Sequence, residues 1–244
     1  MRPNGITLWR QIELSLSADI VSGRLATNQR LPSSDTLATR FGVNRHTVRK
    51  AVARLEAEGL VRIERGRGTY AVVNSLEYNL GPLRLFEQNL HEQNLVPTRT
   101  VLSVLECIPP REAANALEIP SSESALYVVT LGEADGTPVN YGQHYIASSR
   151  LPGIADAFRA FLGKRRQSFS FASLFASCQA HGYRRRNLRI KSRLPSPEEA
   201  HHLNIGTQEP VLITVVTSVG ADNMPLTFAE MSFPSSSTEL TLNF

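Results

Sequence analysis

Apolar residues near the start of the chain recur at the spacing of α-helices. Over about residues 7–22 an apolar side chain comes every fourth position, at Leu8, Ile12, Leu16 and Ile20. Over residues 44–58 the apolar positions are i, i+3, i+4 and i+7, namely Val48, Ala51, Val52 and Leu55. Both spacings place one apolar stripe along a helix, so they predict two helices that pack through these stripes.

The punctuation around these stripes predicts a third, shorter helix and a tight turn. Residues 33–41 follow Pro32, and Gly42 ends the segment. Asn44 is placed to cap the helix at 44–58, because an Asn side chain accepts an unpaired N–H of the first turn. The order of helix, tight turn and helix is typical of a helix-turn-helix.

The pattern changes after Gly59, which ends the second of these helices. Residues 60–64 and 69–73 are predicted as two strands joined by the tip Arg65-Gly66-Arg67-Gly68. A glycine-bearing tip between two such segments favours a β-hairpin. A hairpin directly after a helix-turn-helix predicts a winged helix-turn-helix over residues 1–73.

Charge indicates what this module binds. Residues 1–75 hold twelve Lys and Arg against six Asp and Glu, whereas the whole chain has a formal net charge of only +4. A helix fits the major groove of duplex DNA, where arginine recognises guanine, and wing arginines suit phosphates or a narrow minor groove. We therefore predict a DNA interface made by Ser33, Asn44, Arg45, His46, Thr47, Arg49, Lys50, Arg65, Gly66 and Arg67.

The remainder of the chain predicts an α+β domain. Residues 74–81 are short and polar and are expected to be a linker, and Pro82 suits the first turn of a helix at about 82–92. Residues 112–130 and 198–216 repeat one another at an offset of 86, with seven identities in nineteen positions. Each copy predicts a short helix, an apolar strand and a hairpin, which together favour an antiparallel sheet with one covered face.

The repeat also predicts which strands meet. If the copies are related by a pseudo-twofold, Gln143 and Glu230 are equivalent, face one another and would naturally line a pocket. A generic α-β-β pattern is the alternative explanation. Between the copies we expect helices at about 152–162 and 168–180, followed by a basic strand at 184–194. Strict alternation of side chains would place Arg185 and Arg189 on the same face of that strand.

The N-terminal motifs resemble those of a known family. Leu31-Pro32-Ser33, the run from Phe41 to Ala51, Glu58-Gly59-Leu60 and Gly66-Arg67-Gly68-Thr69 resemble the DNA-binding domain of GntR-type bacterial transcription regulators. The resemblance implies a homodimer that binds an inverted repeat in double-stranded DNA. It also implies that Arg45, Thr47 and Arg49 contact bases and phosphates, with Gly66 as the wing contact. The sequence departs from the family at Ser34-Asp35, where many members carry Glu-Arg.

The C-terminal part, residues 82–244, is similar to the UTRA effector domain of the HutC subfamily. Its Pro97-Thr98 pair, its Asp135-Gly136-x-Pro138 hairpin and its Pro225 to Glu230 segment carry the similarity. The resemblance implies a chorismate-lyase-like fold that binds a small, often anionic metabolite and dimerises. Further motifs, such as His144-Tyr145, resemble those of phosphonate-utilisation regulators.

A ligand-responsive regulator that acts as a repressor is thus the function that the sequence favours. Its effector is expected to be a small anion such as a phosphonate, with an amino sugar phosphate or a carboxylated metabolite as alternatives. Arginine pairs well with phosphate oxygens. The candidate effector-binding residues are Phe86, Asn89, Thr98, His144, Ser170, Arg189 and Glu230.

Other classes of function are less favoured. A chorismate-lyase-like enzyme lacks a visible nucleophile and base, and a non-specific architectural DNA binder is a further alternative. Cys107 and Cys178 have no metal-binding spacing, and His201-His202 has no third ligand at a suitable distance along the chain. We expect no cofactor, no metal, no membrane span and a cytoplasmic protein.

Overall fold

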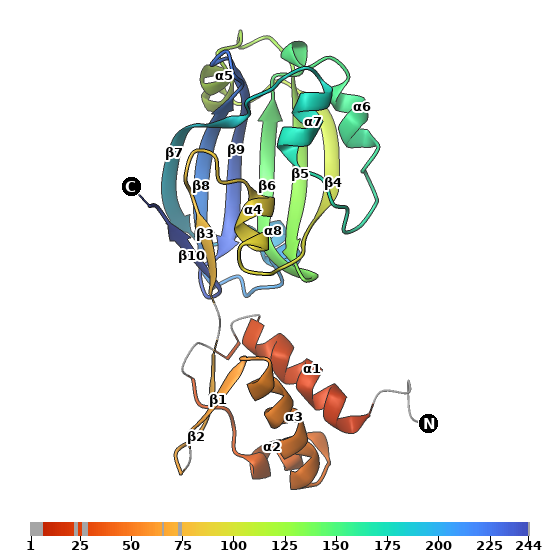
Figure 1. Ribbon diagram of the computed structural model, residues 1–244, viewed down its shortest axis with the longest axis vertical. Coiled ribbons are helices and arrows are strands. Elements are labelled where there is room, and N and C mark those ends of the chain that lie inside the picture. Colours follow the sequence, from red (N-terminus) through yellow and green to blue (C-terminus); the bar gives the residue numbers. More distant parts are fainter. Residues whose placement is uncertain (1–6, 22–23, 26–28, 65, 73–74, 244) are drawn as a thin grey trace. The chain divides into compact units, whose positions relative to one another are not determined.

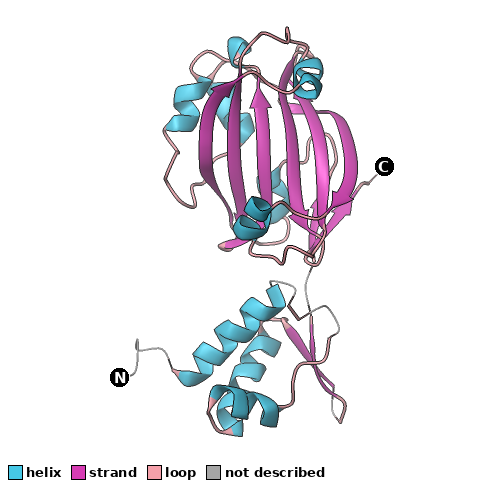
Figure 2. Ribbon diagram, turned by 180° about the vertical axis from the view of Figure 1, so that it is seen from behind, coloured by secondary structure: helices cyan, strands magenta, loops and turns pink. Residues whose placement is uncertain are grey.

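The computed structural model describes residues 7–21, 24–25, 29–64, 66–72 and 75–243. The chain divides into two units, residues 1–76 and residues 77–244. Figures 1 and 2 show the elements of each unit.

The N-terminal unit is a three-helix arrangement followed by a hairpin. Its elements are α1 (Leu8–Val21), α2 (Ser34–Phe41), α3 (Arg45–Ala57), β1 (Val61–Glu64) and β2 (Gly68–Ala71). The strands pair in antiparallel register. This order confirms the winged helix-turn-helix that the sequence predicts.

The core of this unit is the apolar stripe of α3 packed against α1 and α2. The four α3 residues predicted to form that stripe are all buried, and Ile12, Leu16 and Ile20 of α1 pack with them. Leu8 is the exception, because it stands at the first turn of α1 with 58% of its surface exposed. The prediction that Leu8 packs in the core was therefore wrong.

The C-terminal unit is built on a six-stranded antiparallel sheet in the order β4-β5-β6-β9-β8-β7. Its strands are β4 (Pro97–Cys107), β5 (Ala125–Ala134), β6 (Thr137–Ile146), β7 (Arg184–Arg193), β8 (Val211–Val219) and β9 (Pro225–Pro234). One face carries α4 (Phe86–His91), α6 (Ile154–Arg159) and α7 (Phe171–Ser177), with the short 3-10 turn η1 (Ser148–Arg150) nearby. The other face carries α5 (Arg111–Leu117) and α8 (Pro197–Leu203), toward opposite ends of the sheet (Figure 2).

The internal repeat is confirmed as a structural pseudo-twofold. The return strands β6 and β9 pair at the centre of the sheet, and Gln143 lies opposite Glu230 as predicted. The outer pairings also match, since Glu106 lies opposite Leu126 and Ser192 opposite Leu212, each shifted by the same 86 residues. The two halves of the sheet are therefore equivalent strand by strand.

The expected linker differs from what the structure contains. Leu76–Asn79 forms strand β3, which pairs with β10 (Thr238–Thr241) in a small second sheet. The side chain of Tyr78 is buried and packs against Phe233 with the ring centres 4.9 Å apart, so this segment packs like a core strand. Residues 73 and 74 lie outside the described residues. The helix expected to start at Pro82 begins only at Phe86, because residues 81–84 form a turn closed by the Arg84 N–H and the Gly81 carbonyl.

Candidate functional site

The start of α3 presents the predicted DNA-reading residues. Arg45, His46, Arg49 and Lys50 are all exposed. Asn44 caps the helix, because its Oδ1 accepts hydrogen bonds from the backbone N–H of Thr47 at 2.8 Å and from the Thr47 hydroxyl at 2.9 Å. Asn44 and Thr47 thus fix the helix start from which the basic side chains project.

Two of these basic side chains already have partners within the unit. The Arg45 guanidinium forms an ion pair with Asp35 of α2, and both side chains are more than half exposed. The Lys50 ammonium lies 4.8 Å from the centre of the Trp9 ring, a cation–π contact with α1. Ser33 caps α2 by accepting the Thr36 N–H at 3.1 Å. Asp35 thus holds Arg45, the first of the arginines that are predicted to contact DNA.

The wing has the backbone that its glycines predict. Gly66 has φ +77° and Gly68 φ +131°, conformations that L side chains rarely adopt. Arg67 is largely exposed, with its guanidinium 3.7 Å from the Glu64 carboxylate. Arg65 lies outside the described residues.

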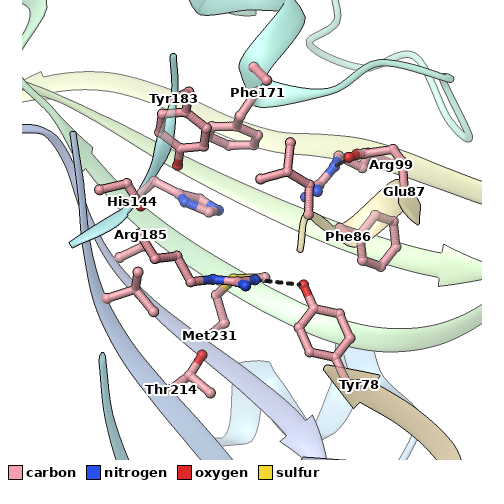
Figure 3. A pocket seen from close by; sticks show the side chains of 15 residues that line it. Tyr78, Phe86, Glu87, Arg99, His144, Phe171, Tyr183, Arg185, Thr214 and Met231 are labelled. Carbon is pink, nitrogen blue, oxygen red and sulfur yellow. Dashed lines mark hydrogen bonds and ion pairs between the residues drawn. The ribbon is translucent and has the colours of Figure 1, made fainter. Parts of the chain in front are cut away.

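The C-terminal unit holds a cavity between its main sheet and the residues that connect β3 to α4. We call residues 78–87 the cover segment: it runs from β3 into the first turn of α4. Figure 3 shows the cavity bounded by Tyr78 and Phe86 of this segment and by His144 and Phe171. Among the described residues that line it, the charged side chains are Glu87, Arg99 and Arg185. The described lining therefore has one more positive than negative side chain.

Arg99, from β4, is the most enclosed charge in the cavity. It is 5% exposed, and its guanidinium lies 4.3 Å from the ring centre of Phe86 and 5.2 Å from that of Phe171. Its Nε donates to Glu87 Oε1 at 3.0 Å, whereas the buried Nη1 has no hydrogen-bond partner among the residues that the structure describes. A buried guanidinium with an unused donor is suited to an incoming anion, because leaving such a donor unpaired is costly.

Arg185, from the opposite edge strand β7, fastens the cover segment. Its Nη1 donates to the Gly81 carbonyl at 2.8 Å and to the Arg84 carbonyl, and its Nη2 lies 3.5 Å from the Tyr78 hydroxyl (Figure 3). The guanidinium therefore holds the turn between β3 and α4 at several points.

His144, from β6, contributes a neutral polar group. Burial, aided by the positive charge of Arg99, lowers the pKa of His144 to about 3. The ring shares a 3.1 Å hydrogen bond with the Thr130 hydroxyl and packs on Phe171 with ring centres 4.5 Å apart. The ring consequently adds no charge to the cavity near neutral pH.

The cavity is small as it stands. The centres of water molecules can reach about 60 Å³ inside it, which is room for roughly four to six waters at ~10–15 Å³ each. A small acid with about as many heavy atoms is therefore of the right size, provided that it displaces this water.

Arg189 and Glu230 do not line this cavity, contrary to the prediction. Arg189 pairs with Glu112 of α5, and the Glu230 carboxylate accepts hydrogen bonds from Lys191 and Arg193, each at 2.8 Å. For Arg189 the reason is a β-bulge in β7, where the register shifts between Arg185 and Asn187. One extra residue reverses which side chains face the cavity, so Arg185 faces it while the later cations face the other side of the sheet.

Gln143 and Glu230 are opposite one another as predicted, but the expected pocket is not between them. Their neighbours on the same strands, His144, Ala229 and Met231, line the cavity instead. Since side chains alternate between the faces of a sheet, Gln143 and Glu230 point to the face that carries α5 and α8.

The other predicted effector residues divide into two groups. Phe86 and His144 line the cavity. Asn89, Thr98 and Ser170 do not line it. Asn89 holds α4 to β3 through the backbone of Asn79, and Ser170 caps α7. The Thr98 hydroxyl is buried and has no partner within the described ranges.

Sequence reasoning missed Tyr78, Arg99, Tyr183 and Arg185 as cavity residues. A signal for two of them was present, because Arg99 and Arg185 are 86 residues apart, the offset of the internal repeat. In the sheet, Arg99 lies opposite Gly132 and Arg185 opposite Ser218, so the two arginines occupy equivalent places.

Comparison with known proteins identifies both units. Residues 8–71 match the gntR family of bacterial regulatory proteins, and residues 92–239 match the UTRA domain. The chain belongs to the GntR family. Its order of domains fits the HutC subfamily within the GntR regulators.

Individual GntR relatives agree with this assignment. The chain is 31% identical over 183 residues to the probable transcriptional regulator PhnF of Escherichia coli, covering 75% of this chain and 72% of that protein. It is 29% identical to an uncharacterised HTH-type transcriptional regulator of Rhizobium meliloti, covering 99% and 96% of the two proteins. The crystal structure of PhnF from Mycobacterium smegmatis has the same fold, with a TM-score of 0.63 at 19% identity over 96% of this chain and 98% of that one.

As a GntR member, the chain is a DNA-binding, ligand-responsive transcription regulator and not an enzyme. Within the ranges that the structure describes, no helix is long and apolar enough to cross a bilayer. The same ranges contain no group of three or more His, Cys, Asp or Glu side chains placed to hold a metal ion.

Proposed function

We propose that this GntR regulator is a repressor controlled by a small phosphorus-containing acid, such as a phosphonate, bound in the cavity beneath the cover segment. The observation that carries the proposal is the buried Arg99 guanidinium, whose Nη1 has no partner in the described part of the chain. Phosphonate and phosphate oxygens match the fork of N–H donors on arginine, which favours an acid of this kind as the occupant.

The size and polarity of the cavity support a small occupant. Methylphosphonate has about as many heavy atoms as the waters that the cavity can hold, whereas an amino sugar phosphate is several times larger. The hydroxyls of Thr214, Ser218 and Tyr183 offer further hydrogen-bond partners around the cavity.

At the DNA, we propose that two copies of the chain bind an inverted repeat, each placing the start of α3 in the major groove. The exposed arginines at positions 45 and 49, one helical turn apart, support this placement. A twofold dimer matches the symmetry of such a repeat, and a dimer seated on a promoter excludes other proteins from that DNA.

The test begins with selection of duplexes from a random library by the full-length protein. The proposal predicts recovery of an inverted repeat, and it predicts that methylphosphonate or inorganic phosphate releases the protein from that repeat in a gel-shift titration. A reporter gene behind the repeat is expected to be expressed more strongly when the regulator is deleted.

Recovery of no repeat would contradict the DNA part of the proposal. Release by glucosamine 6-phosphate alone, with no effect of the smaller acids, would replace the effector that we propose with the amino sugar phosphate. Equal binding to every duplex, with a steep dependence on salt, would instead indicate a non-specific DNA binder.

A further inference from the structure

The two cavity arginines hold the same segment from opposite edges of the sheet. Arg99 on β4 and Arg185 on β7 occupy equivalent register positions, and both contact the cover segment. Figure 3 shows Arg185 reaching Tyr78 at one end of this segment and Arg99 beside Glu87 at the other. The internal repeat has thus placed one cation at each end of the cover segment.

The two arginines differ in what they hold. Arg185 donates to the neutral carbonyls of Gly81 and Arg84. Arg99 donates to a carboxylate, that of Glu87 in the first turn of α4. A carboxylate and the acid group of a ligand are chemically equivalent partners for arginine, so only the contact of Arg99 can be exchanged for a ligand anion.

Glu87 satisfies Arg99 incompletely. It accepts from Nε alone, and Nη1 remains buried with no partner among the described residues. Nη1 lies on the far side of the guanidinium from the Nε–H, so the Glu87 carboxylate on Nε leaves it unpaired, whereas a free acid can accept from Nη1 and Nη2 together at the end of the guanidinium. The side chain of Glu87 is 21% exposed against 6% for Arg99, so Glu87 borders solvent and Arg99 does not.

We propose that Glu87 is the counter-anion of Arg99 until the effector's acid group replaces it, and that effector binding exchanges one anion for the other. This inference rests on the proposed function, since it requires an acidic effector in this cavity. On binding, the acid accepts from Nη1 and the adjacent Nη2 of Arg99, and the Glu87 carboxylate, repelled by this second anion beside the same guanidinium, turns into water. The exchange keeps the buried cation paired throughout, which avoids the large cost of leaving it alone.

The exchange loosens α4, because it breaks one of the two contacts that Arg99 makes with that helix. Arg99 pairs with Glu87 and lies against the ring of Phe86, the first residue of α4. Movement of α4 reaches β3 directly, since Asn89 of α4 bonds both the N–H and the carbonyl of Asn79 in β3. β3 follows the winged helix-turn-helix in the sequence and is separated from β2 by only a few residues. The acid therefore acts on the segment through which the two units are joined.

The experiment measures binding of methylphosphonate and inorganic phosphate to the full-length protein by calorimetry. Glu87→Gln removes the competing charge, so this variant is expected to bind the acids about tenfold more tightly than the unmodified protein. Glu92→Gln is the matched control, because Glu92 ends the same helix, pairs with Arg84 and does not line the cavity. Its affinity for the acids is expected to be unchanged, and Arg99→Gln is expected to abolish binding.

The rate of hydrogen exchange of the α4 backbone is a second measurement, and tighter acid binding alone would not change it. Methylphosphonate is expected to speed exchange at residues 86–91 in the unmodified protein, and Glu87→Gln to show fast exchange there without any acid. Thermal unfolding of the variants establishes that they are folded.

If Glu87→Gln binds the acids no more tightly than the unmodified protein does, the exchange of Glu87 for the acid on Arg99 is overturned, while the proposed function stays intact. Binding by neither protein would remove the proposed effector class, and the exchange with it. Tighter acid binding by Glu87→Gln together with slow hydrogen exchange in the α4 backbone would show that Glu87 competes with the acid but that α4 is not released, which contradicts the second part of the proposal.

Discussion

Glu199→Gln tests whether the buried charge network beneath α8 stabilises the C-terminal unit as its geometry implies. The Glu199 carboxylate is 2% exposed and accepts from Arg193 Nη1 at 2.6 Å and Nη2 at 2.9 Å, from the Ser232 hydroxyl, and from the Ser196 N–H at 2.7 Å. Burial by itself raises the pKa of Glu199, but the hydrogen bonds from Arg193, Ser232 and the Ser196 backbone outweigh it and lower the pKa to about 2.

The magnitude follows from the difference between this pKa and the ordinary value of 4.5. Each unit of difference is worth about 1.4 kcal/mol, so the ionised carboxylate contributes roughly 3 kcal/mol to the free energy of unfolding. Because the folded-state pKa is the lower one, this contribution is present above about pH 4.5 and is lost as the pH falls toward 2. Glutamine keeps the cap at Ser196 through its amide oxygen and removes the charge.

The assay is urea unfolding of both proteins between pH 7 and pH 3, followed by circular dichroism. Trp9, the one tryptophan of the chain, lies in the N-terminal unit, and its fluorescence reports that unit separately as an internal control. We expect Glu199→Gln to be less stable by about 3 kcal/mol at pH 7, with the difference shrinking below pH 4.5. A difference that stays constant down to pH 3 would refute the reasoning, because it would arise from lost packing and not from charge.

Two other substitutions test the DNA interface and the cavity wall. Arg45→Ala is expected to weaken binding to the selected repeat by about tenfold in a filter-binding assay, because one specific arginine contact is lost. Arg54→Ala on the same helix is the control and is expected to have little effect. Equal losses of affinity in the two variants would argue against base reading by Arg45. Gly132→Ala places a Cβ 2.7 Å from the Asn140 amide and 2.9 Å from the Phe86 ring. We expect this crowding to lower the free energy of unfolding by roughly 1–3 kcal/mol in calorimetry, whereas Gly206→Ala, whose Cβ meets open space, is expected to change it little. Similar losses in the two variants would refute the crowding.

Local signals in the sequence were sufficient for the winged helix-turn-helix. The cap at Asn44 and the stripe of α3 depend on residues a few positions apart, and both appear in the structure. The internal repeat likewise predicted the pairing of Gln143 with Glu230, because identical patterns at a fixed offset fold into equivalent strands.

The cavity could not be predicted in the same way. The bulge at Arg186 reverses the facing of Arg185 relative to Arg189, and simple alternation does not reveal a single inserted residue. Tyr78 was assigned to a linker because its strand is short and pairs with β10, which lies at the far end of the sequence. Arg99 follows Thr98, the residue predicted instead, and only the three-dimensional packing of Phe86 and Phe171 over its guanidinium marks it as a cavity residue.

The central claim is that a small acid on Arg99 controls how tightly the protein holds its DNA. The most direct measurement is fluorescence anisotropy of a labelled duplex carrying the selected repeat, titrated with the full-length protein at increasing methylphosphonate. We predict that the acid weakens DNA binding by about tenfold or more in the unmodified protein and leaves Arg99→Gln unaffected. An unchanged affinity in the unmodified protein, or an equal shift in Arg99→Gln, would contradict the account.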